Sequence, residues 1–237
     1  MSEAQLPLAL PAREARGRGD LYADAATSRV LAELAAPWPG LKWALSGPAG
    51  SGKSHISQVW AEGRGARIAR AADLREQDVP DLATGPLVVE DVPGLGRAQA
   101  AALFHLMNEM AGRRPLLLTG TGDPARWDVP LPDLASRIAA AGASRIEPPS
   151  DELLGVVLVK LFSERGLAPA PSLVAWLLPR MERDLGAAAR LVADLDMAAL
   201  SEGRAPSRAM AARIMGERAP REAVDARQMP LPLAAGG

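Results

Sequence analysis

Eight residues that follow a short apolar run constrain the fold of this chain more than any other feature. They are Gly47-Pro48-Ala49-Gly50-Ser51-Gly52-Lys53-Ser54, and they match the pattern of a phosphate-binding loop at every fixed position. The preceding residues 43–45 are apolar and predict a buried strand, whereas residues 55–62 contain neither Gly nor Pro and predict a helix. A strand, a glycine-rich loop and a helix in this order predict an α/β domain that binds phosphate groups.

The chemistry expected of this loop follows from its residue types. Its backbone N–H groups would surround phosphate oxygens, and the amino end of the following helix would add its positive dipole. Lys53 would reach the terminal phosphates, and the hydroxyl of Ser54 would bind Mg²⁺. We therefore predict ADP or ATP, together with Mg²⁺, as ligands. The alternative is a glycine-rich turn without this purpose, which would not need the lysine and the hydroxyl in these places.

The composition narrows the class of protein. The chain has 237 residues, of which 48% are hydrophobic, enough for one α/β domain and a smaller appendage. It has no cysteine, which excludes a disulfide scaffold and a thiolate metal site. Its 27 basic and 28 acidic residues argue against broad electrostatic binding of nucleic acid. Neither a membrane-spanning run nor a signal-peptide pattern is found, so we expect a cytoplasmic protein with no membrane partner.

Strand and helix patterns alternate along the first two thirds of the chain. Besides the elements around the loop, the sequence predicts helices near 25–36 and 99–111 and strands near 66–69, 87–89, 116–119 and 144–146. Continuous apolar strands that alternate with helices are typical of a mainly parallel sheet flanked by helices. The predicted fold is therefore an α/β domain with a five-stranded sheet.

From Ser150 onward only helical patterns remain, which predicts a small all-α domain. Its later helices are expected near 172–178, 182–200 and 207–217. Both ends of the chain read as flexible tails. The expected organisation is a tail (1–19), the α/β domain (20–149), the all-α domain (150–217) and a second tail (218–237).

Polar side chains end two of the predicted strands. Glu90 and Asp91 follow the apolar strand 87–89, at the place where a phosphate-loop protein holds Mg²⁺ and orients water. Thr119 ends the neighbouring strand, where its hydroxyl would meet the attacking water or the terminal phosphate. Taken singly, two acids and a threonine are ordinary ways to end a strand. Beside a phosphate loop, they predict a nucleotide and magnesium site.

Three further segments carry a family resemblance. They are Leu131-Pro132-Asp133-Leu134-Ala135-Ser136-Arg137, Glu147-Pro148-Pro149-Ser150-Asp151-Glu152 and Glu182-Arg183-Asp184-Leu185-Gly186-Ala187-Ala188. With the loop and the acidic strand end, they resemble the AAA+ module of the bacterial replication initiator DnaA and its relatives. Among these relatives the chain resembles the Hda family, the DnaA-homologous regulatory inactivators. The resemblance covers about residues 20–217 and implies that the all-α domain is the helical lid of an AAA+ module.

The resemblance assigns roles to two arginines. It makes Arg137 an arginine finger that acts on the nucleotide of a neighbouring subunit, and Arg183 a second sensor that touches the phosphates of its own subunit. Without the resemblance each would be an ordinary surface arginine. Glu90 departs from the family, because the initiator usually has Asp there, and we therefore expect the chain's own ATPase activity to be weak or absent.

The tails contain candidate docking peptides. Gln5, Leu6, Leu8 and Leu10 resemble the short motif that docks on the DNA polymerase III sliding clamp (beta subunit), since an extended peptide can bury these leucines on one side. A similar sequence pattern recurs at Gln228, Met229, Leu231 and Leu233. This segment is a candidate second clamp-binding peptide or a chance likeness in a Pro-Leu tail. The alternative for the first peptide is an unstructured apolar tail.

The resemblance implies a regulator of replication initiation. It would carry a nucleotide, most simply ADP, dock on the DNA-loaded clamp and stimulate ATP hydrolysis by DnaA through Arg137, which prevents over-initiation. No sequence-specific DNA binding is expected, because no basic recognition helix follows the lid. The sequence does not decide between a monomer and a homo-oligomer. One alternative is a self-contained AAA+ ATPase of the helicase-loader type, and another is a small-molecule P-loop kinase. The near-zero charge and the few aromatic residues argue against the loader.

Overall fold

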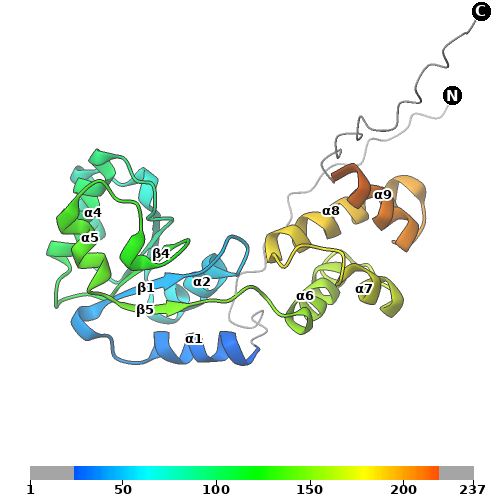
Figure 1. The fold of residues 1–237 in the computed structure, drawn as a ribbon, viewed down its shortest axis with the longest axis horizontal. Coiled ribbons are helices and arrows are strands. Elements are labelled where there is room, and N and C mark those ends of the chain that lie inside the picture. The colour runs from blue at the N-terminus through cyan, green and yellow to red at the C-terminus, as the bar shows by residue number, and fades with distance from the viewer. Residues whose placement is uncertain (1–23, 219–237) are drawn as a thin grey trace, which may run out of the picture.

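The structure is a computed structural model, and it describes residues 24–218. Strands and helices alternate up to Arg145, and only helices follow (Figure 1). The elements are α1 (Ala25–Ala35), β1 (Lys42–Ser46), α2 (Lys53–Arg64), β2 (Arg67–Arg70), α3 (Val79–Leu82), β3 (Leu87–Glu90), α4 (Arg97–Glu109), β4 (Leu116–Gly120), α5 (Pro132–Ala139), β5 (Gly142–Arg145), α6 (Asp151–Ser163), α7 (Pro171–Leu177), α8 (Leu185–Glu202) and α9 (Arg208–Arg218).

The five strands form one parallel sheet in the order β2-β3-β4-β1-β5. This confirms the predicted five-stranded α/β fold. The last strand begins at Gly142, two residues before the predicted start, and pairs there with Trp43 of β1. A side chain at position 142 would overlap the indole ring of Trp43, so this edge of the sheet needs glycine. Sequence periodicity does not report such a long-range packing contact.

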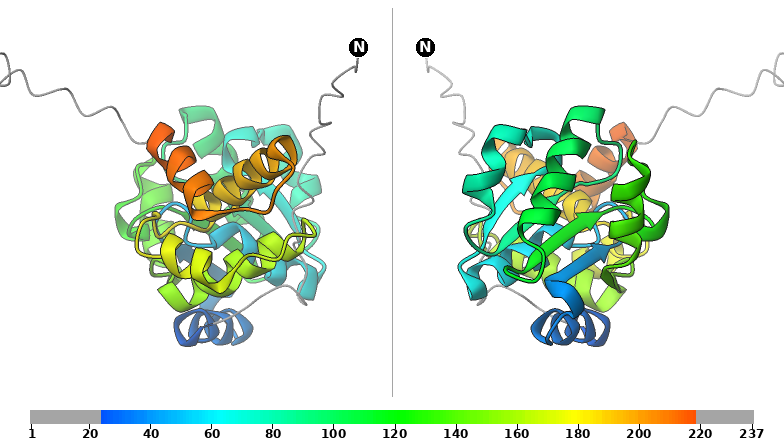
Figure 2. Two further views of the ribbon diagram at one scale, coloured as in Figure 1. Left: turned by 90° about the vertical axis from the view of Figure 1, so that its right-hand side faces the viewer. Right: turned by 90° about the vertical axis from the view of Figure 1, so that its left-hand side faces the viewer.

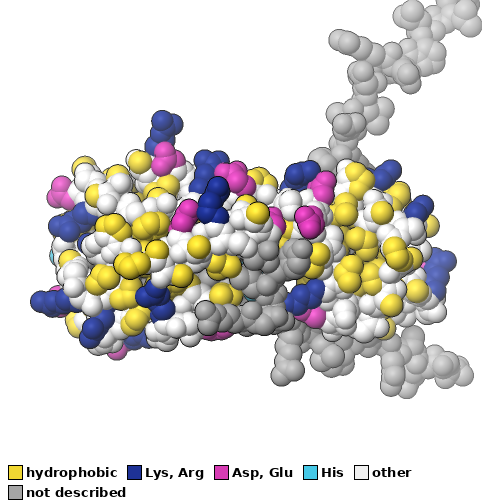
Figure 3. Space-filling view, turned by 90° about the horizontal axis from the view of Figure 1, so that it is seen from below, with side chains coloured by type: hydrophobic (Ala, Val, Ile, Leu, Met, Phe, Trp, Pro, Cys, Tyr) yellow, Lys and Arg dark blue, Asp and Glu magenta, His cyan; other side chains and the backbone are white. Residues whose placement is uncertain are grey.

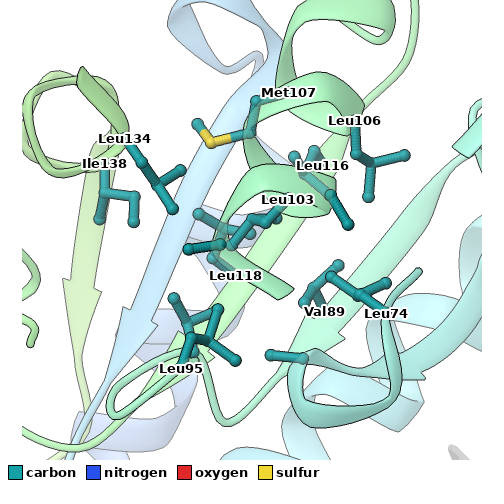
Figure 4. Packing of buried hydrophobic residues seen from close by; sticks show 14 of the residues in the cluster. Leu74, Val89, Leu95, Leu103, Leu106, Met107, Leu116, Leu118, Leu134 and Ile138 are labelled. Atoms are coloured by element: carbon teal, nitrogen blue, oxygen red, sulfur yellow. The ribbon is translucent and has the colours of Figure 1, made fainter. Parts of the chain in front are cut away.

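Both faces of the sheet are covered, because successive residues of each strand point to opposite sides. The right-hand view of Figure 2 shows α1 (dark blue) below the strands and the green helices on their other side. On one face α4 and α5 pack on the sheet, and Figure 4 shows Leu103 and Met107 of α4 with Leu134 and Ile138 of α5 around Leu118 of β4. On the other face, Val30 and Leu34 of α1 and Ile56 and Trp60 of α2 pack with residues of the strands, which are Leu45, Val88 and Leu117.

The helices α6–α9, which we call the lid after the resemblance described above, have a core of their own. Its buried residues all lie between Leu154 and Ile214, and Phe162 is fully buried among them. Helix α8 begins at Leu185, not at the predicted residue 182. Asp184 explains the later start, since its carboxylate accepts a hydrogen bond from the N–H of Ala187 at 2.6 Å and caps the helix there.

The surface carries no single dominant charge on the face seen in Figure 3. Lys and Arg side chains alternate there with Asp and Glu, and apolar side chains gather over the lid. The large apolar residues exposed on the lid are Val156, Val159, Met197 and Leu200. Across residues 24–218, the structure contains no helix with both the length and the apolar character that a membrane crossing requires.

Candidate nucleotide-binding site

The phosphate loop, residues 47–54, connects β1 to α2 at the carboxyl edge of the sheet. Gly50 and Gly52 have φ angles of +66° and +95°, in the left-handed region where a side chain is strained. Gly52 is the N-cap of α2, so Lys53 and Ser54 begin that helix. The N–H of Gly47 donates to Gly120 O of β4 at 3.3 Å, which ties the loop to the neighbouring strand.

Lys53 lies inside the loop and is buried. Its Nζ donates to the carbonyl oxygens of Gly47 at 2.9 Å and Pro48 at 2.7 Å. Burial lowers the pKa of Lys53 below its usual value, while the negative charges of nearby acids act in the opposite direction. These acids are Asp91, Asp184 and Glu90. Lys53 is thus held at the loop with three acidic residues near it.

The predicted acidic strand end meets the loop. Glu90 closes β3, and Asp91 follows it with a φ angle of +58°, uncommon for a residue with a side chain. The N–H of Asp91 donates to Thr119 Oγ1 at 3.4 Å, and Thr119 is buried in β4 between β3 and β1. The parallel order β3-β4-β1 therefore brings Glu90, Asp91 and Thr119 to the edge where the loop begins.

Ser57 is a site residue that the sequence pattern did not reveal. It lies one turn after Ser54 on α2, is fully buried, and its Oγ approaches Glu90 Oε1 at 2.7 Å and Ser54 O at 3.0 Å. A hydroxyl has one proton, so it donates to one of these oxygens at a time. The hydrogen bond to the carboxylate holds the longer side chain of Glu90 back against α2, beside the predicted metal ligand Ser54.

Replacing Ser57 with alanine is expected to weaken nucleotide binding in the presence of Mg²⁺ by roughly threefold to tenfold, because a hydrogen bond to a charged group is lost. The measurement is ADP affinity by fluorescence titration, with Mg²⁺ and with a chelator. S163A, which changes an exposed serine of the lid, is the matched control. An equal loss with and without Mg²⁺ would contradict a role in positioning Glu90.

The donor set fits a nucleotide with magnesium. The buried Ser51 Oγ has no hydrogen-bond partner within residues 24–218, as expected of a group that meets a phosphate oxygen. Ser54 is exposed at the start of α2, and Glu90 and Asp91 supply the hard oxygen ligands that Mg²⁺ prefers. Among residues 24–218, no three or more His, Cys, Asp or Glu side chains are grouped so that they could hold a metal ion by themselves. Protein side chains would therefore hold the ion together with phosphate oxygens.

The lid reaches the phosphate loop through the start of α8. The N–H of Leu185 donates to Gly50 O at 2.8 Å. Arg183, the predicted second sensor, is instead exposed and pairs with Asp151 Oδ1 of α6 at 3.0 Å. The lid residue beside the loop is Asp184, whose carboxylate lies so close to Gly50 that any side chain at position 50 would overlap it.

Arg137 lies at the other end of the strands, opposite the phosphate loop. It occupies the last turn of α5, shortly before β5 begins beside Trp43 near the start of β1. The five residues of β1 separate this edge from the phosphate loop by about 13 Å of strand. The Arg137 guanidinium stacks over the ring of Phe104 at 4.8 Å. Burial, and secondly the charge of Arg137, lower the pKa of Lys42.

The guanidinium of Arg137 contacts the ring of Phe104 through its central carbon. Within residues 24–218 no hydrogen bond or ion pair is recorded for its guanidinium. A guanidinium is planar, and its five N–H donors point outward in that plane. The two candidate clamp-binding peptides, at residues 5–10 and 228–233, lie outside the described residues.

Known structures share this arrangement of sheet and lid, although no protein-family model matches the sequence. Domain III of the replication initiation protein DnaA from Thermotoga maritima is similar with a TM-score of 0.71 and 14% identity, over 88% of this chain and 98% of that one. The RuvB Holliday junction branch migration motor of Thermotoga maritima has a TM-score of 0.59 and 16% identity, over 74% of this chain and 61% of that one.

A nucleotide-bound structure is also similar. AMPPCP-bound DnaA from Aquifex aeolicus has a TM-score of 0.52 and 20% identity, over 70% of this chain and 58% of that one. The chain thus spans less than two thirds of this DnaA structure and of RuvB, but nearly all of DnaA domain III. The parallel five-stranded sheet, its flanking helices and the following helical part thus have the same fold as DnaA domain III and RuvB.

Proposed function

We propose that this chain is a regulatory inactivator of DnaA of the Hda type. It binds an adenine nucleotide in its phosphate loop, docks on the DNA-loaded sliding clamp through Gln5, Leu6, Leu8 and Leu10, and presents Arg137 to ATP held by DnaA. Hydrolysis then takes place in DnaA, which is left in its ADP form. The chain acts as the activator of another protein's ATPase.

The position of Arg137 carries this proposal. An arginine at the edge opposite its own phosphate loop is suited to a nucleotide on a neighbouring molecule and not to its own. Its unengaged N–H donors match what a developing negative charge on a transferring phosphoryl group needs. The likeness to DnaA domain III supports a matching surface on the partner, since AAA+ modules of one fold can pack side by side.

The chain's own site supports a bound nucleotide. Lys53 and the loop N–H groups would hold the phosphates, and Ser54, Glu90 and Asp91 would hold Mg²⁺. Magnesium, when bound, would neutralise phosphate charge. Thr119 would contact the terminal phosphate or a water beside it. Arg183 would act as the second sensor only after leaving Asp151, because its guanidinium is engaged there.

The test is phosphate release from ATP-loaded DnaA, with and without this protein, in the presence and absence of clamp loaded on DNA. We expect acceleration that requires both the protein and the clamp. ATP turnover by this protein alone, with no effect on DnaA, would favour the self-contained ATPase of the helicase-loader type.

Phe104 offers a finer test of the same step. The change Phe104→Leu keeps an apolar side chain against the core but removes the ring under Arg137. We expect stimulation of DnaA to fall by roughly twofold to fivefold, since a cation–π contact contributes about 0.5–1 kcal/mol. F104Y keeps a ring and should retain stimulation. Equal stimulation by F104L and the wild type would show that the stacking does not position the finger.

A further inference from the structure

The start of α8 brings one negative charge against the phosphate loop. Asp184 contacts Gly50, and Leu185 holds this part of the lid in place through its hydrogen bond to Gly50 O at 2.8 Å. Leu185 also packs on Gly52, where an added Cβ would lie 3.2 Å from its Cδ1. Three contacts between lid and loop therefore fix the position of the Asp184 carboxylate.

Arg183 and Asp184 are neighbours in the chain, but their charged groups lie in different places. Arg183 is directed toward Asp151 of α6 and is exposed, whereas Asp184 is partly buried at the loop. Asp184 caps α8 through the N–H of Ala187, which fixes its backbone and side chain. A phosphate group that enters the loop consequently meets the carboxylate of Asp184 and not the guanidinium of Arg183.

We propose that Asp184 is a specificity-determining residue of the nucleotide site. Its carboxylate weakens the binding of phosphate groups at the loop and does so more for ATP than for ADP. The inference rests on nucleotide binding at this loop, which is the first part of the proposed function. It explains in chemical terms how a chain with a complete phosphate loop can favour the nucleotide with fewer charges.

The physical reason is charge repulsion in a poorly solvated place. Like charges held a few ångströms apart at a protein surface repel far more strongly than they do in bulk water. ATP carries one more phosphate, and about one more negative charge, than ADP. The repulsion from a fixed carboxylate therefore grows with the number of phosphates, while the contacts that nucleoside and inner phosphates make are the same.

The change Asp184→Asn removes the negative charge but keeps the shape of the side chain. Asparagine caps helices about as well as aspartate and has nearly the same shape, so α8 and its contact with Gly50 are retained. The measurement is the affinity of the full chain for fluorescent ADP and ATP, each with Mg²⁺ and with a chelator. E182Q changes an exposed acid two residues away by the same charge and serves as the matched control. K53A is the control for binding through the loop.

We expect D184N to bind ATP roughly tenfold more tightly and ADP about threefold more tightly than the wild type, with E182Q unchanged. Equal affinities in D184N and the wild type would overturn the inference alone. Weaker binding in D184N only when Mg²⁺ is present would also overturn it, because Asp184 would then hold the ion. Failure of the wild type and of D184N to bind either nucleotide would overturn the proposed nucleotide-bound state and this inference with it.

Discussion

Arg137→Ala is expected to lower clamp-dependent ATP hydrolysis by DnaA about a thousandfold or more, which in a standard assay reads as complete loss of stimulation. An arginine finger places its N–H donors where negative charge develops on the phosphoryl group, and alanine has no donor to replace them. Arg137→Lys should recover only a part of the rate, because a lysine offers a point charge instead of a planar fork.

The control for this variant must retain the fold and the binding of the clamp. R126A removes an arginine with the same charge from the carboxyl edge of the sheet, where Arg126 is mostly exposed and only loosely paired with Asp123. R126A should stimulate DnaA as the wild type does, and R137A should still bind the clamp. Normal stimulation by R137A, or loss of clamp binding in that variant, would contradict the proposed mechanism.

Phe162→Ala is expected to unfold the lid domain while the sheet domain stays folded. Phe162 lies in the last turn of α6 and is fully buried in a core that is formed only by lid residues. Replacing a buried phenylalanine with alanine costs about 3–5 kcal/mol. A domain as small as the lid has little more stability than this to lose.

Limited proteolysis and thermal unfolding would measure the effect. We expect early cleavage within residues 150–218 and a separate transition at lower temperature. V159A truncates a half-exposed valine of the same helix and should change the lid little. A single unfolding transition at the wild-type temperature would show that the lid does not depend on this core.

The local pattern of the sequence was sufficient for the elements of the sheet domain. Apolar runs such as 87–89 and 116–119 mark strands that are buried on both faces, and the loop motif requires a strand before it and a helix after it. Boundaries were less accurate where a single capping residue or a close contact sets them. Asp184 moves the start of α8, and the contact between Gly142 and Trp43 accompanies an earlier β5.

The sequence pattern did not predict which side chains of different elements contact each other. Ser57 reads as an ordinary helix residue until α2 packs on β3 and brings its hydroxyl to Glu90. Phe104 reads as a core residue until α5 brings Arg137 over its ring. Both pairings join residues more than thirty positions apart, and periodicity within one element carries no information about them.

The sequence alone determined the phosphate loop, the acids at a strand end and the division into a sheet part and a helical part, because these depend on short-range backbone preferences and apolar spacing. The tertiary structure decided which charged group faces the loop and at which end of the strands Arg137 lies. Arg183 and Asp184 are adjacent in the chain, yet the helix cap and the ion pair with Asp151 direct them to different places. Arg137 lies far from its own loop because a parallel sheet separates the start of β1 from its end.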